Sequence, residues 1–147
     1  MERKEFRITI NAPKEKVWET LWGKNTYRAW TSAFAEGSTV ETDDWKKDSK
    51  VLFLDGKGNG MVSTVVENIP YRYMSFKHLG EIKNGVEDMS STEVSQWSGA
   101  MENYTLKEEG KNTEVVVDMD ISEEFSEMFS QTWPKALNKL KELAEQN

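Results

Sequence analysis

The chain has 147 residues, of which 19 are Lys or Arg and 26 are Asp or Glu, giving a net charge of −7. This length fits a single domain, residues 1–147, and it allows a sizeable core because folding buries roughly 68–70% of the surface of a chain this long. The acidic balance argues against nucleic acid as a partner, since binding to a phosphate backbone needs clustered Lys and Arg.

Cysteine is absent, so the sequence can form neither disulfides nor thiolate zinc sites. No window holds the ~18 apolar residues that a membrane span needs, and no apolar stretch typical of a signal peptide follows the charged start. We therefore expect a cytoplasmic protein that does not insert into membranes.

The N-terminal third predicts one strand and two short helices. Residues 4–10 alternate, with Phe6, Ile8 and Ile10 on one face, which indicates a half-buried strand. A helix should start at residues 11–13, with Asn11 or Ala12 near the N-cap and Pro13 in the first turn, and should end at Gly23. Residues 25–31 predict a second short helix.

The middle of the chain predicts antiparallel strands. A weak strand is expected at 38–41 and stronger ones at 51–54, 61–69 and 72–78, with a glycine-rich turn at 55–60 and a corner at 68–70. The polar segment 80–96 has no periodic pattern, which predicts a long loop of the functional or disordered kind. Strands at 97–106 and 113–119 should form a hairpin across 109–112.

The last segment, residues 122–145, predicts a long amphipathic helix, because its apolar residues recur at the i, i+3, i+4, i+7 spacing. Ser122 is expected to cap this helix. Pro134 lacks an N–H and disfavours an α conformation at Trp133, which predicts a bend or break within 132–134.

The order β-α-α-β-β-β-β-β-β-α predicts an α+β fold in which a curved antiparallel sheet of about six to seven strands wraps around the C-terminal helix. In a meander, alternate turns lie at the same end of the sheet. The 55–60 turn, the 80–96 loop and the start of the last helix should therefore share one end, where the mouth of a pocket is expected.

This organisation resembles the START/Bet v 1-like (SRPBCC) superfamily, whose fold is called helix-grip, and within it the family related to the activator of Hsp90 ATPase (AHSA1-like). The resemblance lies in INAPKEKVW over 10–18, Trp30, Gly60 at a strand start, residues 104–106, and WPKALNKLKEL over 133–143. It implies an apolar cavity between sheet and helix that takes lipids, sterols or aromatic compounds. The family name also implies an Hsp90-type chaperone as a partner and a role in stress response.

Catalytic, metal and cofactor sites are not expected. His78 is the one histidine, and the nucleophile–base–orienter grouping and the GxSxG motif of hydrolases are missing. The 55–60 loop fails as a calcium loop, because Lys57 holds its third position and Val66 its twelfth.

The predicted ligand-binding residues are those expected to face the hollow of the sheet. Alternation leaves Met61 and Val65 against Val62 and Val66 undecided, and Met101 and Asn103 are preferred over Ala100 and Tyr104 because Glu102 should face water. The predicted set is Trp30, Phe53, Met61, Val65, Phe76, His78, Trp97, Met101, Asn103, Phe125, Phe129 and Trp133.

The favoured function is non-enzymatic binding of a small apolar or amphipathic ligand, lipid-like or aromatic, by a monomer or weak homodimer. One alternative is a protein that modulates an Hsp90-type chaperone or acts in stress response. The other, which the superfamily implies, is a cyclase- or hydrolase-like enzyme acting on an aromatic substrate.

Overall fold

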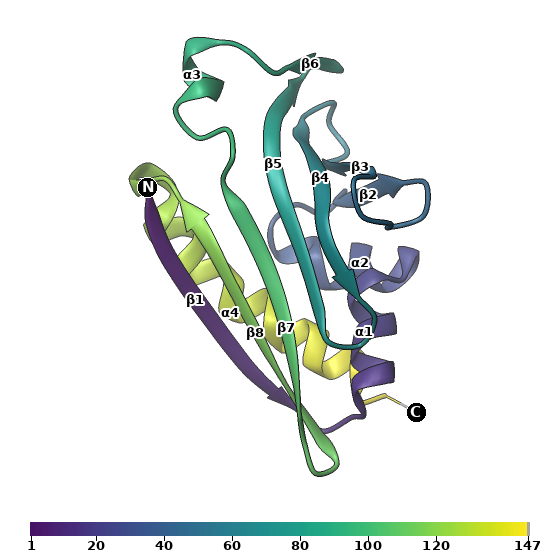
Figure 1. Cartoon of the computed structure of the whole chain (residues 1–147). Coiled ribbons are helices and arrows are strands. Elements are labelled where there is room, and N and C mark those ends of the chain that lie inside the picture. Colours follow the sequence, from purple (N-terminus) through teal and green to yellow (C-terminus); the bar gives the residue numbers. More distant parts are fainter. Residues whose placement is uncertain (147) are drawn as a thin grey trace.

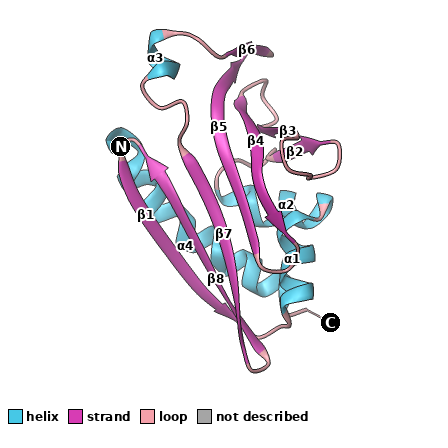
Figure 2. Cartoon of the chain, in the orientation of Figure 1, coloured by secondary structure: helices cyan, strands magenta, loops and turns pink. Residues whose placement is uncertain are grey.

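A computed structural model describes residues 1–146 as a curved antiparallel sheet with helices packed on its inner face (Figure 1, Figure 2). The strands are β1 (Glu2–Ile10), β2 (Thr39–Thr42), β3 (Lys50–Leu54), β4 (Gly60–Ile69), β5 (Tyr73–Lys83), β6 (Val86–Asp88), β7 (Met101–Glu109) and β8 (Asn112–Ile121). The helices are α1 (Lys14–Trp22), α2 (Lys24–Trp30), the 3-10 turn η1 (Thr31–Ala33), α3 (Thr92–Ser95) and α4 (Glu123–Ala144).

The sheet order is β1-β8-β7-β5-β4-β3-β2, and every neighbouring pair is antiparallel. The predicted α+β helix-grip fold is confirmed, with one more strand than expected. The additional strand is β6, which pairs with β5 beyond the end of β7.

Helix α4 lies across the inner face of the sheet because its apolar stripe is buried there. Trp133, Leu137 and Leu140 are each at most 4% exposed, and the Trp133 ring stacks on Phe6 of β1 with the ring centroids 5.8 Å apart. Figure 1 shows α4 behind β1, β8 and β7, with α1 and α2 beside its C-terminal half. No helix within residues 1–146 is long and apolar enough to cross a membrane.

The predicted break in α4 at Pro134 is wrong, since the helix runs without interruption through residues 132–134. A proline inside a helix costs about 3 kcal/mol, chiefly through a lost hydrogen bond and a steric clash. Burial of Trp133 and Leu137 on either side of the exposed Pro134 offsets that cost.

The starts of α1 and α4 differ in detail from those predicted. The N-cap of α1 is Pro13, which has an extended backbone, so the helix starts after the proline and not around it. Ser122 is the N-cap of α4 as expected, but its side chain accepts no hydrogen bond from the helix.

The expected loop at 80–96 is largely ordered secondary structure. β5 continues to Lys83, and Asn84 and Gly85, with φ of 51° and 79°, turn the chain directly into β6. The Ser91 hydroxyl then caps α3, and Val94 in that helix is fully buried. The segment therefore contacts the upper end of β5 through β6 and α3, although most of its side chains are exposed (Figure 1).

Candidate ligand-binding site

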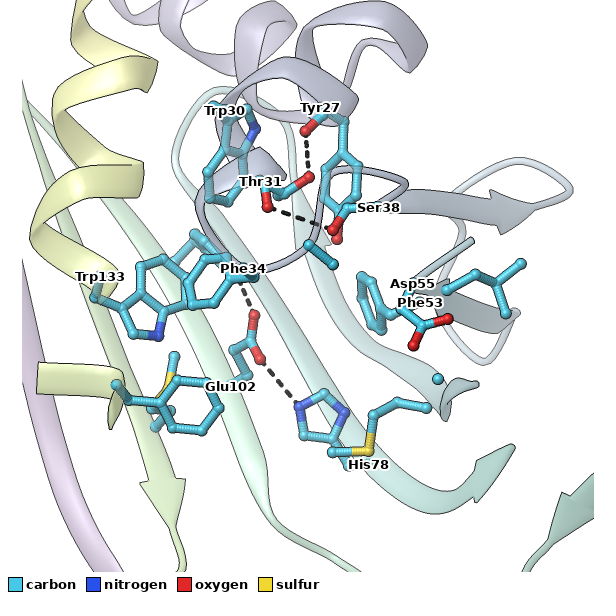
Figure 3. Close-up of a pocket in the computed structure, with 17 residues that line it drawn as sticks. Tyr27, Trp30, Thr31, Phe34, Ser38, Phe53, Asp55, His78, Glu102 and Trp133 are labelled. Atoms are coloured by element: carbon cyan, nitrogen blue, oxygen red, sulfur yellow. Dashed lines mark hydrogen bonds and ion pairs between the residues drawn. The ribbon is translucent and has the colours of Figure 1, made fainter. Parts of the chain in front are cut away.

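The inner pocket is a cavity of ≈ 300 Å³ between the sheet, the α2–η1 segment and α4 (Figure 3). Its walls are mostly aromatic. The lining residues are Tyr27, Trp30, Thr31, Phe34, Ala35, Ser38, Phe53, Leu54, Asp55, Gly60, Met61, His78, Glu102, Tyr104, Met119, Phe129 and Trp133.

The outer pocket, of ≈ 550 Å³, adjoins the inner one and shares Asp55, Gly60, Met61, His78 and Phe129 with it. Its other lining residues are Met1, Glu81, Trp97, Ala100, Asp120, Ile121, Ser122, Phe125 and Met128. These residues lie at the end of the molecule that carries the 55–60 turn and the start of α4, which is the end where the sequence places the mouth.

Most of the predicted site residues border one of the two pockets. Those that line the inner pocket are Trp30, Phe53, Met61, His78, Phe129 and Trp133. Trp97 and Phe125 line the outer pocket, although Trp97 lies in the turn before β7 and not in the strand predicted there. Val65 and Phe76 are fully buried in the core and line neither pocket.

Residues 61–65 follow plain alternation, with Met61, Ser63 and Val65 on the inner side, where they pair with inward residues of β3 or β5. The sequence left this open because both alternating sets contain apolar residues. Of the two register shifts between β4 and β5, one leaves Leu79 of β5 without a partner and the other leaves Val66 of β4 without one.

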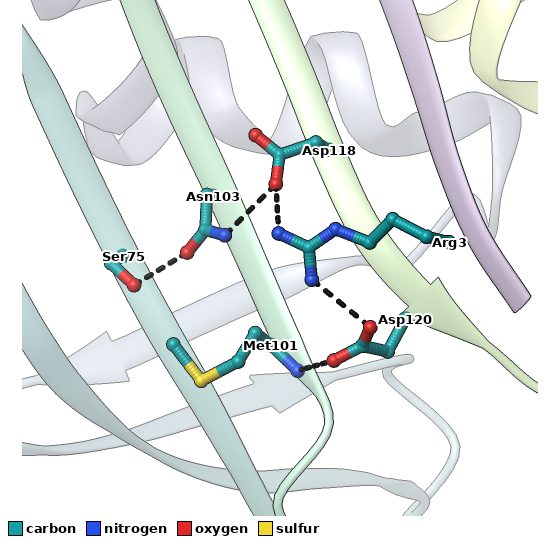
Figure 4. A network of polar contacts seen from close by, with 6 residues as sticks. All are labelled: Arg3, Ser75, Met101, Asn103, Asp118 and Asp120. Carbon is teal, nitrogen blue, oxygen red and sulfur yellow. Dashed lines mark hydrogen bonds and ion pairs between the residues drawn. The ribbon is translucent and has the colours of Figure 1, made fainter. Parts of the chain in front are cut away.

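The inward orientation predicted for Met101 and Asn103 is wrong. In β7 these residues pair with Lys77 and Ser75, on the opposite face of the sheet from the pockets. The Asn103 amide donates to Asp118 at 3.0 Å and accepts from the Ser75 hydroxyl at 2.5 Å (Figure 4). Asn103 therefore belongs to a polar network across the outer face.

Arg3 extends this outer network from β1 to β8, where its guanidinium pairs with both Asp118 and Asp120 (Figure 4). Partial burial alone would raise the pKa of Asp120. The Met101 amide, which donates to Asp120 at 2.9 Å, and the Arg3 guanidinium outweigh it and hold the pKa of Asp120 below its ordinary value. These contacts join the strands at the N-terminal edge of the sheet.

Glu102, expected in water, lies in the inner pocket at the centre of a hydrogen-bonded chain. Its Oε1 is 3.0 Å from His78 Nε2, and its Oε2 accepts from the Tyr104 hydroxyl at 2.5 Å. His78 Nδ1 in turn lies 2.6 Å from the Ser63 hydroxyl. Figure 3 shows Glu102 between Trp133 and Phe34 on one side and Phe53 on the other.

The hydrogen bond to Glu102 determines that Nε2 of the His78 ring carries a proton. An ionised carboxylate can only accept, so Nε2 carries the hydrogen directed at Glu102. Burial is the main cause that raises the pKa of Tyr104 well above its ordinary value, and the Glu102 carboxylate adds to it. The same two causes raise the pKa of Tyr27. Both phenols therefore stay protonated, and the Tyr104 hydroxyl donates to Glu102.

The arrangement is suited to holding a polar group and not to nucleophilic attack. Ser63 is fully buried behind His78 and does not line either pocket, so its hydroxyl cannot reach a substrate there. Within residues 1–146, no group of three His, Asp or Glu side chains is placed to hold a metal ion.

Sequence reasoning missed Glu102, Tyr104 and the wall formed by Tyr27 and Phe34. The signal for Glu102 was present, because Tyr104 and Leu106 follow it at the two-residue period of a strand face. Phe34 lies in a segment after η1 that has no periodic pattern, and only its T-shaped contact with Trp133, with centroids 5.0 Å apart, reveals it as a wall.

Residues 11–145 match the family described as activator of Hsp90 ATPase homolog 1-like protein. The chain belongs to the AHSA1-like family. The match covers almost the whole chain, in agreement with the resemblance drawn from the INAPKEKVW and WPKALNKLKEL segments. No curated protein matches the sequence.

Solved structures share the AHSA1-like fold at low sequence identity. The Aha1 dimer from Colwellia psychrerythraea is 19% identical over 99% of this chain and 97% of its own, with a TM-score of 0.70. CalU16 from Micromonospora echinospora is 16% identical over 97% and 76%, with a TM-score of 0.67. DynU16, a protein in the dynemicin biosynthetic locus, is 14% identical over 99% of this chain but 48% of its own, with a TM-score of 0.73. Identities in this range show the fold alone.

Proposed function

We propose that this AHSA1-like protein binds a small apolar or amphipathic ligand, without chemical conversion, between the sheet and α4. The observation that carries the proposal is the inner pocket of ≈ 300 Å³, which is walled mainly by aromatic side chains. Ligand sites are typically concave, mostly apolar and at least about 300 Å³ in volume, with a few polar groups that fix orientation. Glu102 and His78 would supply those polar groups.

The energetics of the cavity argue against a dry, empty pocket. An empty apolar void costs up to about 24 cal/mol per Å³, so an empty pocket of ≈ 300 Å³ would cost at most about 7 kcal/mol. That is comparable with the whole stability of a domain, about 5–15 kcal/mol. Water around Glu102 or a bound ligand would remove most of this cost. The place of DynU16 in a biosynthetic locus is in keeping with a small-molecule role.

Two matched variants, each replacing an alanine with phenylalanine, test the proposal. Ala35 lines the inner pocket, whereas Ala33, two residues earlier in η1, is exposed. Ala35→Phe should fill the cavity and abolish the rise in melting temperature that bound compounds cause, and Ala33→Phe should leave it unchanged. The probes are a library of neutral, aromatic and amphiphilic compounds, with native mass spectrometry of the protein as purified. Absence of any thermal shift and of any co-purified ligand would overturn the proposal.

A second candidate function is modulation of an Hsp90-type chaperone, which the family description favours. The partner would be the chaperone of the same organism, and the readout its ATPase rate with and without the protein. An unchanged rate at saturating protein, together with no co-sedimentation, would exclude this role without affecting the ligand-binding proposal.

A further inference from the structure

The inner pocket carries a carboxylate, Glu102, that pairs with no lysine or arginine among the described residues. Within residues 1–146, no lysine or arginine lines either pocket. Asp55 borders both pockets, whereas the two carboxylates of the outer pocket are paired, Glu81 with Lys83 at 3.2 Å and Asp120 with Arg3 at 3.0 Å. The positive amino group of Met1 acts on Asp120 at the outer pocket. A ligand with a carboxylate or phosphate head in the inner pocket would therefore meet the like charge of Glu102 and Asp55.

Glu102 keeps capacity for a further donor. An ionised carboxylate has about four lone-pair positions, and His78 and Tyr104 take one on each oxygen. Its side chain is 19% exposed and faces the cavity, because its strand neighbours across the inner face are Phe76 of β5 and Met119 of β8. The contacts with His78 and Tyr104 hold the carboxylate in place among aromatic rings.

The walls around Glu102 favour a cation for a second reason. Aromatic faces attract ammonium groups, and the attraction is stronger where water is excluded. Phe34 and Trp133 lie on one side of the carboxylate and Phe53 on the other (Figure 3). An ammonium group at Glu102 would thus contact ring faces and a carboxylate together.

The shape of the site separates head from tail. The outer pocket continues from the inner one across Met61 and Phe129, and it adds apolar side chains such as Phe125 and Met128, which are 47% and 50% exposed. An alkyl or aryl chain that left the inner pocket would cover these surfaces and shield them from water.

We infer that the ligand is an amphiphilic amine, whose ammonium head donates to Glu102 in the inner pocket while its apolar tail lies in the outer pocket. This inference rests on the proposed function and specifies its ligand class. It excludes fatty acids as the preferred ligands. Fatty acids would otherwise be the first compounds to screen, because the fold resembles one whose members bind lipids.

Isothermal titration calorimetry with three ligands of one chain length tests the inference. The probes are decylamine, decanol and decanoate at about pH 7, each below the concentration at which it forms micelles. The amine should bind tightest and the carboxylate weakest, with at least about a tenfold difference in Kd between them, the size that one charged hydrogen bond provides. This order is measured on the unaltered protein, so it does not depend on whether any variant folds.

Two variants that remove the same charge locate the effect. Glu102→Gln should raise the Kd of decylamine at least about tenfold and leave that of decanol within about twofold, because only the amine uses the negative charge. Glu109→Gln, at an exposed position on the same strand, should change neither.

Each result decides a different point. Decanoate binding as tightly as decylamine overturns the inference and leaves ligand binding standing. An amine preference that survives Glu102→Gln also overturns it, since the charge would then act from elsewhere. Failure of all three ligands to bind, together with a library that gives no thermal shift, overturns the inference and the proposed function together.

Discussion

Replacing Trp133 with alanine should destabilise the protein by about 3–5 kcal/mol, the usual cost of truncating a buried Trp or Phe. Trp133 is 4% exposed and its ring contacts four others, those of Phe6, Trp30, Phe34 and Tyr104, with centroids 5.0 to 6.2 Å apart. Such pairs add about 0.5–1.5 kcal/mol each beyond burial. The void would merge with the inner pocket and admit water, so we expect a loss near the lower limit, about 3 kcal/mol.

The measurement is the free energy of unfolding from urea denaturation, with the slope m compared to show that the unfolded state is unchanged. At 2–4 °C per kcal/mol, typical of domains of about 150–250 residues, the melting temperature should fall by about 6–12 °C. Trp133→Phe keeps an aromatic wall and should lose less than half as much. Lys135→Ala, at an exposed position on the same helix, should change the stability by less than about 0.5 kcal/mol.

A loss below about 1 kcal/mol for Trp133→Ala, equal to that of Lys135→Ala, would refute the reasoning. It would mean that α4 does not hold to the inner face of the sheet through this side chain. The cavity between helix and sheet, on which the proposed ligand site depends, would then have to be abandoned.

Three further results are expected. Gly56→Ala should lower the free energy of unfolding by about 2 kcal/mol in urea denaturation, because φ is 80° and the new Cβ would lie 2.9 Å from the backbone of a neighbouring turn. Gly85→Ala, with φ of 79° and open space around it, should cost only about 1 kcal/mol, and equal costs would contradict the role of that contact. Val94→Ala should speed amide hydrogen exchange around α3 while leaving β8 protected, and exchange that rises equally in both would show that Val94 does not anchor a local unit. Asp120 has a pKa below its ordinary value, so its contribution to stability is present above about pH 4 and is lost as the pH falls through the lowered pKa. The unfolding free energy of Asp120→Asn should therefore fall less on acidification than that of the unaltered protein. Identical acid profiles of the two proteins would refute this.

The periodic elements were predictable from the sequence because one burial pattern dominates each of them. The alternation of Phe6, Ile8 and Ile10 identified β1, and the 3.6-residue spacing of apolar side chains identified α4. Each of these elements packs one face against the core, which leaves a clear imprint on the sequence. Pro134 misled because its local cost was counted without the tertiary burial beside it.

Strand β6 was missed although Asn84–Gly85 is the pair that favours a tight hairpin turn. The flanking residues are polar, and two of the three residues of β6 are exposed, so no apolar alternation marks them as a strand. Local turn chemistry carried the information there, and the hydrophobic pattern did not.

The site was harder to predict than the fold because its polar groups break the usual rules of burial. Glu102 was assigned to water as a carboxylate, but His78 and Tyr104 satisfy its oxygens inside the pocket. The pairing of β7 with β5, which brings these side chains together, is not readable from either strand alone. In β4, apolar residues on both faces left open which of them line the cavity.

Indole side chains stand at both levels of the cavity, Trp30 and Trp133 in the inner pocket and Trp97 in the outer. Their fluorescence depends on the polarity around the ring, so replacement of water by an apolar guest would shift the emission to shorter wavelengths. The molecule thus carries its own optical reporter of occupancy, and single Trp→Phe replacements would tell at which depth a guest has settled.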